Sequence, residues 1–146
     1  MRISVFNSKE VQGTILLMKG APRPIAKQIR ASTKQVVGPV WREAVASHAR
    51  TDIQRSVLAE TSRVAVSDQN TTLSVATVGK KLTGGGTPAQ LAVGAEFGSR
   101  TYKQFGTRVK KGKVVFPAVA EVIPRIASLV VQTTIRTFYE EIEKAK

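Results

Sequence analysis

The spacing of apolar residues changes twice along this chain, and this limits the folds open to it. From Ile25 to Leu58, apolar residues recur at steps of three and four, which is typical of one face of a helix. Residues 63–78 instead alternate as strands do, and the helical spacing returns from Ala118 to Ile142. No strand pattern lies between two helices at the spacing of a parallel crossover. The sequence therefore predicts an α+β fold with a small antiparallel sheet, a long kinked central helix and a C-terminal amphipathic helix.

Turn-forming residues and prolines refine this order. Pro39 interrupts the central stripe and predicts a kink or two abutting helices, because proline lacks the N–H that a helix needs. Asp68-Gln69-Asn70 separates the alternating segments and predicts the turn of a β-hairpin. Residues 3–6 predict a short N-terminal strand, and residues 10–18 predict a short helix. Residues 114–117 predict an extended segment before the last helix.

Residues 79–112 show no regular pattern of apolar residues. They contain Lys80, Lys81, the triple glycine Gly84-Gly85-Gly86 and a further glycine at position 94. Long unpatterned segments in small domains are usually functional or ordered only when bound. We therefore expect a single structural domain over residues 1–146 with a flexible loop at about 79–112.

The charge balance points to polyanionic partners. The chain has 23 Lys and Arg residues against 10 Asp and Glu residues, a net charge of +13. Such a charge concerns partners and solubility, so nucleic acid is the first expected partner and an acidic protein surface the second, while an ordinary basic domain is the alternative. The chain has no cysteine, which excludes disulfides, thiolate metal sites and cysteine nucleophiles. No signal sequence or membrane-spanning apolar run is evident, so we expect a soluble, non-secreted protein with no membrane partner.

The sequence offers few groups for catalysis. The one histidine, His48, falls on the apolar stripe of the central helix, and a packed residue is the favoured interpretation over a catalytic base. No cluster of His or carboxylate residues has the spacing of metal ligands. The triple glycine is followed by Thr87-Pro88, so it lacks the lysine and the Ser or Thr of a phosphate-binding P-loop. We expect no enzymatic activity, no metal and no cofactor.

Two groups of basic residues are candidates for phosphate contact. Lys27, Arg30 and Lys34 lie three and four residues apart and therefore share one helical face. The second group is the cluster Arg108, Lys110, Lys111 and Lys113. A solvated face and a solvated loop remain the alternative interpretation. No aromatic residue alternates with these cations, which favours sequence-independent attraction to a double-stranded DNA backbone over base stacking.

The order of several short motifs resembles a known family. The motifs are Val40-Trp41-Arg42-Glu43-Ala44, Gly84-Gly85-Gly86-Thr87-Pro88, Ala95-Glu96-Phe97-Gly98, Val114-Val115-Phe116-Pro117-Ala118, Ile123-Pro124-Arg125, Val131-Gln132-Thr133 and Arg136-Thr137. In this order they resemble the neck, or tail-completion, proteins of long-tailed bacteriophages, of the lambdoid tail-component type. The resemblance covers most of the chain, from about Val40 to Glu143, and its motifs are specific only in combination.

The resemblance implies a structural role in the virion, at the head–tail junction, with the host cytoplasm as the place of assembly. Such subunits form homo-oligomeric rings, commonly sixfold, that join the head connector or stopper protein to the tail terminator or tail-tube protein around the DNA channel. The subunit-interface candidates are Lys80, Lys81, Gly84, Gly85, Gly86, Glu96, Phe97 and Arg136. The alternatives are a tail-terminator ring that caps the tube and a free, non-specific DNA-binding module.

Overall fold

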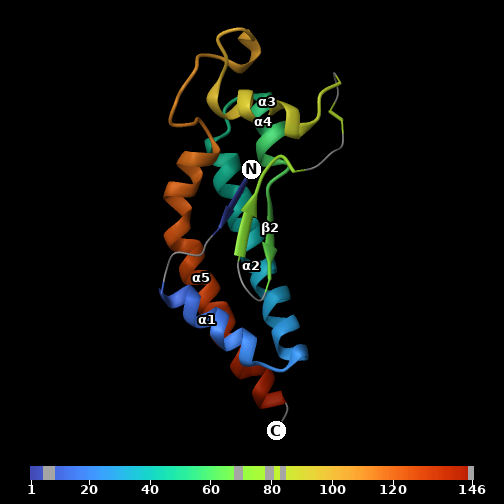
Figure 1. The fold of residues 1–146 in the computed structure, drawn as a ribbon, viewed down its shortest axis with the longest axis vertical. Helices are drawn as coiled ribbons and strands as arrows, with labels where there is room; N and C mark the ends of the chain where they lie inside the picture. The colour runs from blue at the N-terminus through green and yellow to red at the C-terminus, as the bar shows by residue number, and fades with distance from the viewer. Residues whose placement is uncertain (5–8, 68–70, 78–80, 83–84, 145–146) are drawn as a thin grey trace.

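Two long helices lie side by side and carry a small sheet (Figure 1). The computed structural model describes residues 1–4, 9–67, 71–77, 81–82 and 85–144. The elements in chain order are β1 (Arg2–Ser4), α1 (Lys9–Gly20), α2 (Arg23–His48), α3 (Asp52–Gln54), the π-helical turn η1 (Arg55–Ala59), β2 (Arg63–Val66), β3 (Thr71–Ser74), α4 (Pro88–Phe97), the 3-10 turn η2 (Lys103–Phe105) and α5 (Val115–Lys144). The sheet lies over the middle of α2 and α5, α1 crosses their lower half, and α3 and α4 gather at the upper end (Figure 1). The expected α+β class is confirmed.

Helix α2 is the central element, and one stripe of it is buried. Its buried residues recur at three- and four-residue steps and are Ala26, Ile29, Thr33, Val37, Trp41 and Val45. Pro24 occupies the first turn, where its missing N–H has no intrahelical partner to lose. The helix runs as one element through Pro39, so the prediction of two abutting helices is wrong. Pro39 is exposed and leaves the buried stripe intact.

The sheet has the strand order β1-β3-β2, and both pairings are antiparallel. Val64 of β2 pairs with Leu73 of β3, and both side chains are buried against the helices. This confirms the predicted hairpin, and β1 confirms the predicted N-terminal strand at residues 3 and 4. Residues 5–6 of that strand and the predicted turn at 68–70 lie outside the described residues. Strand β3 ends earlier than expected, at Ser74, and Ala76 follows with a φ of 56°. The left-handed backbone at Ala76 ends the regular alternation predicted to continue to residue 78.

Helix α5 packs along α2 and α1 and has its own buried stripe, which includes Ala118, Val122, Ile126 and Val130. By length and composition it is the one helix in the described part of the chain that could cross a membrane. One such helix is weak evidence for a membrane span, because the core helix of a globular domain has the same length and composition. The helix begins at Val115, so the predicted extended segment at 114–117 is wrong.

The prediction of one flexible loop over about 79–112 is wrong for residues 88–97, which form α4. Thr87 caps this helix in a reciprocal pair with Gln90: each side chain accepts a hydrogen bond from the other residue's backbone N–H. Pro88 follows at the first helical position, where proline is favoured. Helix α4 is short and apolar on most sides, with Ala92 and Ala95 buried and Val93 exposed, so it shows no amphipathic period in the sequence.

Candidate nucleic-acid interface

The carboxylate of Glu96 joins α4 to the start of α5. It is fully buried and accepts three backbone N–H groups: those of Val114 and Val115 at Oε2, over 3.1 and 2.7 Å, and that of Phe116 at Oε1, over 3.0 Å. The first N–H groups of a helix have no intrahelical acceptor, and a negative charge there also interacts favourably with the positive end of the helix dipole. Glu96 therefore stabilises the beginning of α5. The sequence predicts Glu96 as a subunit-interface candidate, whereas these bonds hold its carboxylate inside the domain.

The segment between the two helices, residues 98–113, folds back on α4 and will be called the loop segment. The backbone N–H of Val109 donates to the carbonyl of Phe97 over 2.7 Å, and that of Lys113 donates to the carbonyl of Glu96 over 2.8 Å. The ammonium group of Lys113 donates to the carbonyl of Phe105 over 2.9 Å. These bonds fix both ends of the segment. The bond to Phe105 also occupies one N–H of the Lys113 ammonium group, so this phosphate-contact candidate already has a hydrogen-bond partner within the chain.

Gly112 is required where the loop segment meets Glu96. Its φ is +85°, and a Cβ atom there would collide with Oε1 of Glu96 and lie 3.0 Å from the ring of Phe116. We expect Gly112→Ala to lower the free energy of unfolding by about 2–3 kcal/mol, combining left-handed strain with displacement of the carboxylate. Chemical denaturation followed by circular dichroism measures this.

Gly85 provides the matched control for this substitution. Its φ is +100°, but a Cβ atom there would meet nothing within 4 Å. We expect Gly85→Ala to cost only the backbone strain, about 1 kcal/mol. Equal losses of stability in Gly112→Ala and Gly85→Ala would show that the collision with Glu96 contributes nothing to the loss in Gly112→Ala.

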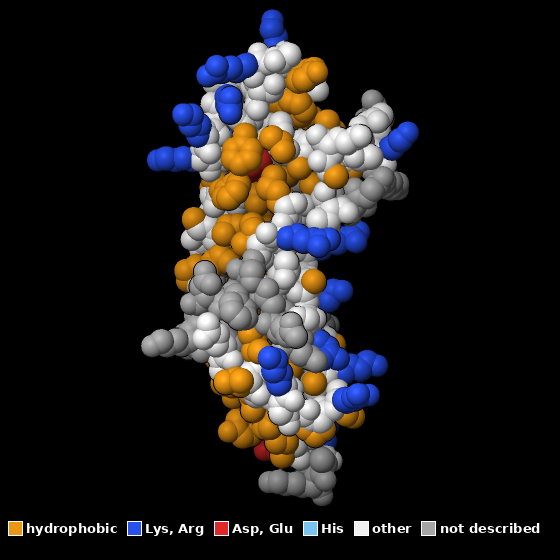
Figure 2. All heavy atoms as spheres, viewed as in Figure 1, with side chains coloured by type: hydrophobic (Ala, Val, Ile, Leu, Met, Phe, Trp, Pro, Cys, Tyr) orange, Lys and Arg blue, Asp and Glu red, His pale blue; other side chains and the backbone are white. Residues whose placement is uncertain are grey.

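The other basic candidates of the loop segment, Arg108, Lys110 and Lys111, are exposed. Figure 2 shows Lys and Arg side chains around the upper end of the molecule and along the edge where α2 lies, with little acidic surface in view. The structure thus separates the two predicted basic groups, because the loop segment is at the α4 end and Lys27 and Lys34 are on α2.

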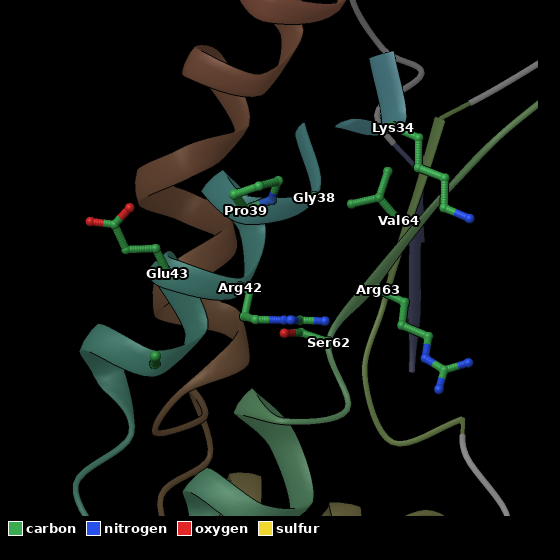
Figure 3. Close-up of a pocket in the computed structure, with 9 residues that line it drawn as sticks. Lys34, Gly38, Pro39, Arg42, Glu43, Ser62, Arg63 and Val64 are labelled. Carbon is green, nitrogen blue, oxygen red and sulfur yellow. The ribbon is translucent and has the colours of Figure 1, made fainter. Parts of the chain in front are cut away.

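Beside β2, the cations of α2 line a hollow (Figure 3). Lys34 and Arg42 come from α2 and Arg63 from β2, and all three extend toward the same side of the hollow. Glu43, which also lines it, points in the opposite direction. Three cations with no carboxylate directed at them provide a favourable site for an anion.

The strand register extends this cationic surface across the sheet. Ser74 of β3 is paired with Arg2 of β1 on one side and with Arg63 of β2 on the other. Directly paired residues point to the same face of a sheet, so the two arginines flank Ser74 on the exposed face. We call the surface formed by Lys27, Lys34 and Arg42 with Arg2 and Arg63 the α2–sheet face.

Sequence reasoning found part of the α2–sheet face and missed the rest. Lys27 and Lys34 are exposed as predicted, whereas Arg30 is half-buried and interacts within the chain. Arg42 lies eight residues after Lys34, so continuing the same helical face would have found it. Arg2 and Arg63 come together only through the strand pairing, which the spacing of residues does not reveal.

His48 is half-buried at the end of α2, and its imidazole has three polar neighbours. Its Nδ1 lies 2.9 Å from the carbonyl oxygen of Ala44, and its Nε2 lies 3.1 Å from Oε2 of Glu121. Ser47 is also adjacent, with its hydroxyl oxygen 3.3 Å from Nδ1, and this hydroxyl donates to the same Ala44 carbonyl. In the part of the chain that the structure describes, no group of three or more His or carboxylate residues is placed to hold a metal ion.

The predicted subunit-interface residues that the structure describes differ in burial and lie on several parts of the fold. Lys81 and Gly85 are exposed, and Phe97 is half-buried, with its ring tilted by 41° against that of Phe116 and the ring centroids 5.6 Å apart. Gly86 is half-buried beside Leu91, where a Cβ atom would lie 2.9 Å from the leucine side chain. Arg136 is exposed on α5, 3.9 Å from Glu140. Lys80 and Gly84 lie outside the described residues.

Comparison with known proteins gives no indication of a function for the α2–sheet face. No protein-family model, no curated protein and no solved structure matches the chain. The α2–sheet face and the loop segment are therefore the two features that bear on its function.

Proposed function

We propose that this protein is a structural subunit of the head–tail junction of a long-tailed phage, where it forms a neck or tail-completion ring around the DNA channel. The observation that carries the proposal is the α2–sheet face, on which Lys34, Arg42 and Arg63 line a hollow and the carboxylate of Glu43, which also lines it, points away from them. The motif order, which resembles that of tail-completion proteins, supports a position at the head–tail junction. In this proposal the protein has no catalytic activity and needs no cofactor.

The chemistry of the α2–sheet face fits the phosphate backbone of duplex DNA. Its cations come from a helix and from two strands, so they form an extended surface rather than a closed pocket. Among the described residues, the most exposed aromatic side chains, Tyr102, Phe116 and Tyr139, lie on other elements. Without stacking groups, binding depends on charge and is independent of sequence and sensitive to salt. Sequence-independent binding of this kind is compatible with a channel through which any part of a genome passes.

Neutralising the hollow should weaken DNA binding. We expect Lys34→Gln combined with Arg42→Gln and Arg63→Gln to lower the affinity for a short duplex by about tenfold or more at ~0.1 M salt. The slope of log affinity against log salt should fall by about 2–3, close to one for each phosphate contact removed. Fluorescence anisotropy of a labelled duplex over a salt series measures both quantities.

The matched control removes three exposed cations elsewhere. Arg50, Arg55 and Arg125 are exposed and do not line the hollow. Changing these three to glutamine alters the net charge equally and should change the salt slope far less. If both triple variants lose the same affinity, binding reflects net charge and the assignment of the α2–sheet face fails.

The position on the particle is tested by electron microscopy. Purified protein mixed with tail tubes should form rings at one tube end, and a preparation showing only free monomers would contradict the proposal. A lysate lacking the gene should contain tails of normal length that are not joined to heads. Overlong tubes in that lysate would instead indicate a tail terminator.

A further inference from the structure

Two exposed apolar patches lie near opposite ends of the molecule. Near the upper end, Val93, Tyr102 and Phe116 have exposed fractions of 66%, 62% and 47%, and Val109 is also exposed; we call these four residues the loop-end patch. Near the end of α5, Ile135 and Tyr139 are exposed by 42% and 63%. Figure 2 shows hydrophobic side chains at both ends, bordered by Lys and Arg at the upper end. Exposed apolar side chains that lie near one end of a molecule are candidates for an interaction surface.

The charges around the two patches have opposite signs. Residues 98–113 carry six cations and no acid: Arg100, Lys103, Arg108, Lys110, Lys111 and Lys113. Residues 135–144, which contain Ile135 and Tyr139, carry the three acids Glu140, Glu141 and Glu143. They also carry two cations: Arg136 lies 3.9 Å from Glu140, and Lys144 lies 3.3 Å from Glu141. We call Ile135 and Tyr139 with Glu140 and Glu143 the helix-end patch. Three acids and two cations give residues 135–144 a net charge of −1 in a chain of net charge +13, so the helix-end patch is a surface that a basic, apolar partner can approach.

We infer that the loop-end patch of one copy of this chain binds the helix-end patch of a second copy. This inference rests on the proposed ring and names the surfaces that build it. Two copies repel over most of their basic surfaces, so opposite charge at these two ends also selects the orientation of contact.

A protein partner fits the loop-end patch better than DNA does. Burying the rings of Tyr102 and Phe116 together with the side chain of Val93 gains free energy only against another apolar surface. Phosphates would engage Lys110 and Lys111 but leave these apolar groups in water. The α2–sheet face shows the contrasting arrangement, with cations and no exposed aromatic ring among its five residues.

Contact between two different patches has a geometric consequence. Each copy then presents one surface of each kind, so assembly is head-to-tail. Such a contact closes into a ring when the rotation between copies is right and otherwise continues as a filament. A ring built this way keeps the α2–sheet face outside the contact, because none of its residues belongs to either patch.

Reversing the charge of each patch in a separate variant, and then mixing the two variants, tests the inference. In the first variant, Lys110→Glu and Lys111→Glu make the border of the loop-end patch acidic; in the second, Glu140→Lys and Glu143→Lys make the helix-end patch basic. All four side chains are exposed, so both variants should fold, with melts like that of the wild type. We expect each variant alone to be monomeric at concentrations where the wild type associates, and their equimolar mixture to associate again. Analytical ultracentrifugation over a concentration series measures this.

The control variant carries Arg50→Glu and Arg125→Glu and should associate like the wild type. Association of either single-patch variant at wild-type strength, a mixture that stays monomeric, or a wild type that is monomeric at every concentration would each overturn the inference. Loss of DNA affinity in the Lys110→Glu, Lys111→Glu variant with unchanged association would assign the loop segment to DNA instead. If both charge-reversal variants still form rings on tail tubes as the wild type does, the proposed function stands and these two surfaces are refuted.

Discussion

Replacing Trp41 with alanine is expected to lower the free energy of unfolding by about 3–5 kcal/mol. Trp41 is fully buried in the middle of α2, and its indole Nε1–H donates to the carbonyl of Ser74 over 3.2 Å. The substitution leaves a large cavity between α2 and the sheet, and it leaves the carbonyl of Ser74 without its hydrogen-bond donor. Urea denaturation followed by circular dichroism measures the loss, because Trp41 is the only tryptophan and its fluorescence disappears in the variant.

Trp41→Phe is the matched control, since it keeps most of the ring volume but has no N–H. We expect it to lose about 1–2 kcal/mol, for the smaller ring and the missing hydrogen bond. A loss below about 1 kcal/mol for Trp41→Ala would contradict the burial of this side chain.

Replacing Glu96 with alanine is expected to cost about 3–4 kcal/mol, because it leaves three backbone N–H groups at the start of α5 without their acceptor. Each orphaned buried donor costs about 1–3 kcal/mol, and local rearrangement or entry of water reduces the sum. The loop segment should also loosen, since Glu96 connects it to both helices. Hydrogen exchange measures that effect as faster exchange at Val114, Val115 and Phe116 than in the wild type.

Two further variants separate the charge of Glu96 from its shape. In Glu96→Gln the amide oxygen can still accept two N–H groups, while the NH₂ group opposes the third, so we expect about half the loss seen with alanine. Glu60→Ala removes an exposed acid and should change stability by less than about 0.5 kcal/mol. Identical stabilities of the Glu96→Ala variant and the wild type would show that water replaces the carboxylate without cost.

The main elements could be predicted because their apolar spacing is regular over many residues. The buried stripes of α2 and α5 follow helical steps, and the β2–β3 hairpin follows strict alternation. Helix α4 has no such period, because its small and apolar residues face several directions. Its start was nevertheless encoded, since Thr87 and Gln90 have the spacing of a reciprocal cap.

The residues of the candidate sites were predictable only where they share an element. Lys27 and Lys34 follow from helical spacing, whereas Arg2 and Arg63 meet through strand register. Glu96 is the clearest case of a residue misplaced from sequence. An acid between glycines and lysines indicates a surface contact, but its partners lie 18–20 residues further along the chain and bring it into the interior.

The loop segment is tied at both ends within one chain, and this has a thermodynamic consequence for assembly. Restricting a free backbone costs about 1–2 kcal/mol of conformational entropy per residue, and most of this cost here is met when the domain folds. In the proposed ring, docking of a neighbour would then order few additional residues, which lowers the entropic cost of association. The proposal therefore predicts that a variant that releases Glu96 weakens association between copies, although this carboxylate is buried inside the domain.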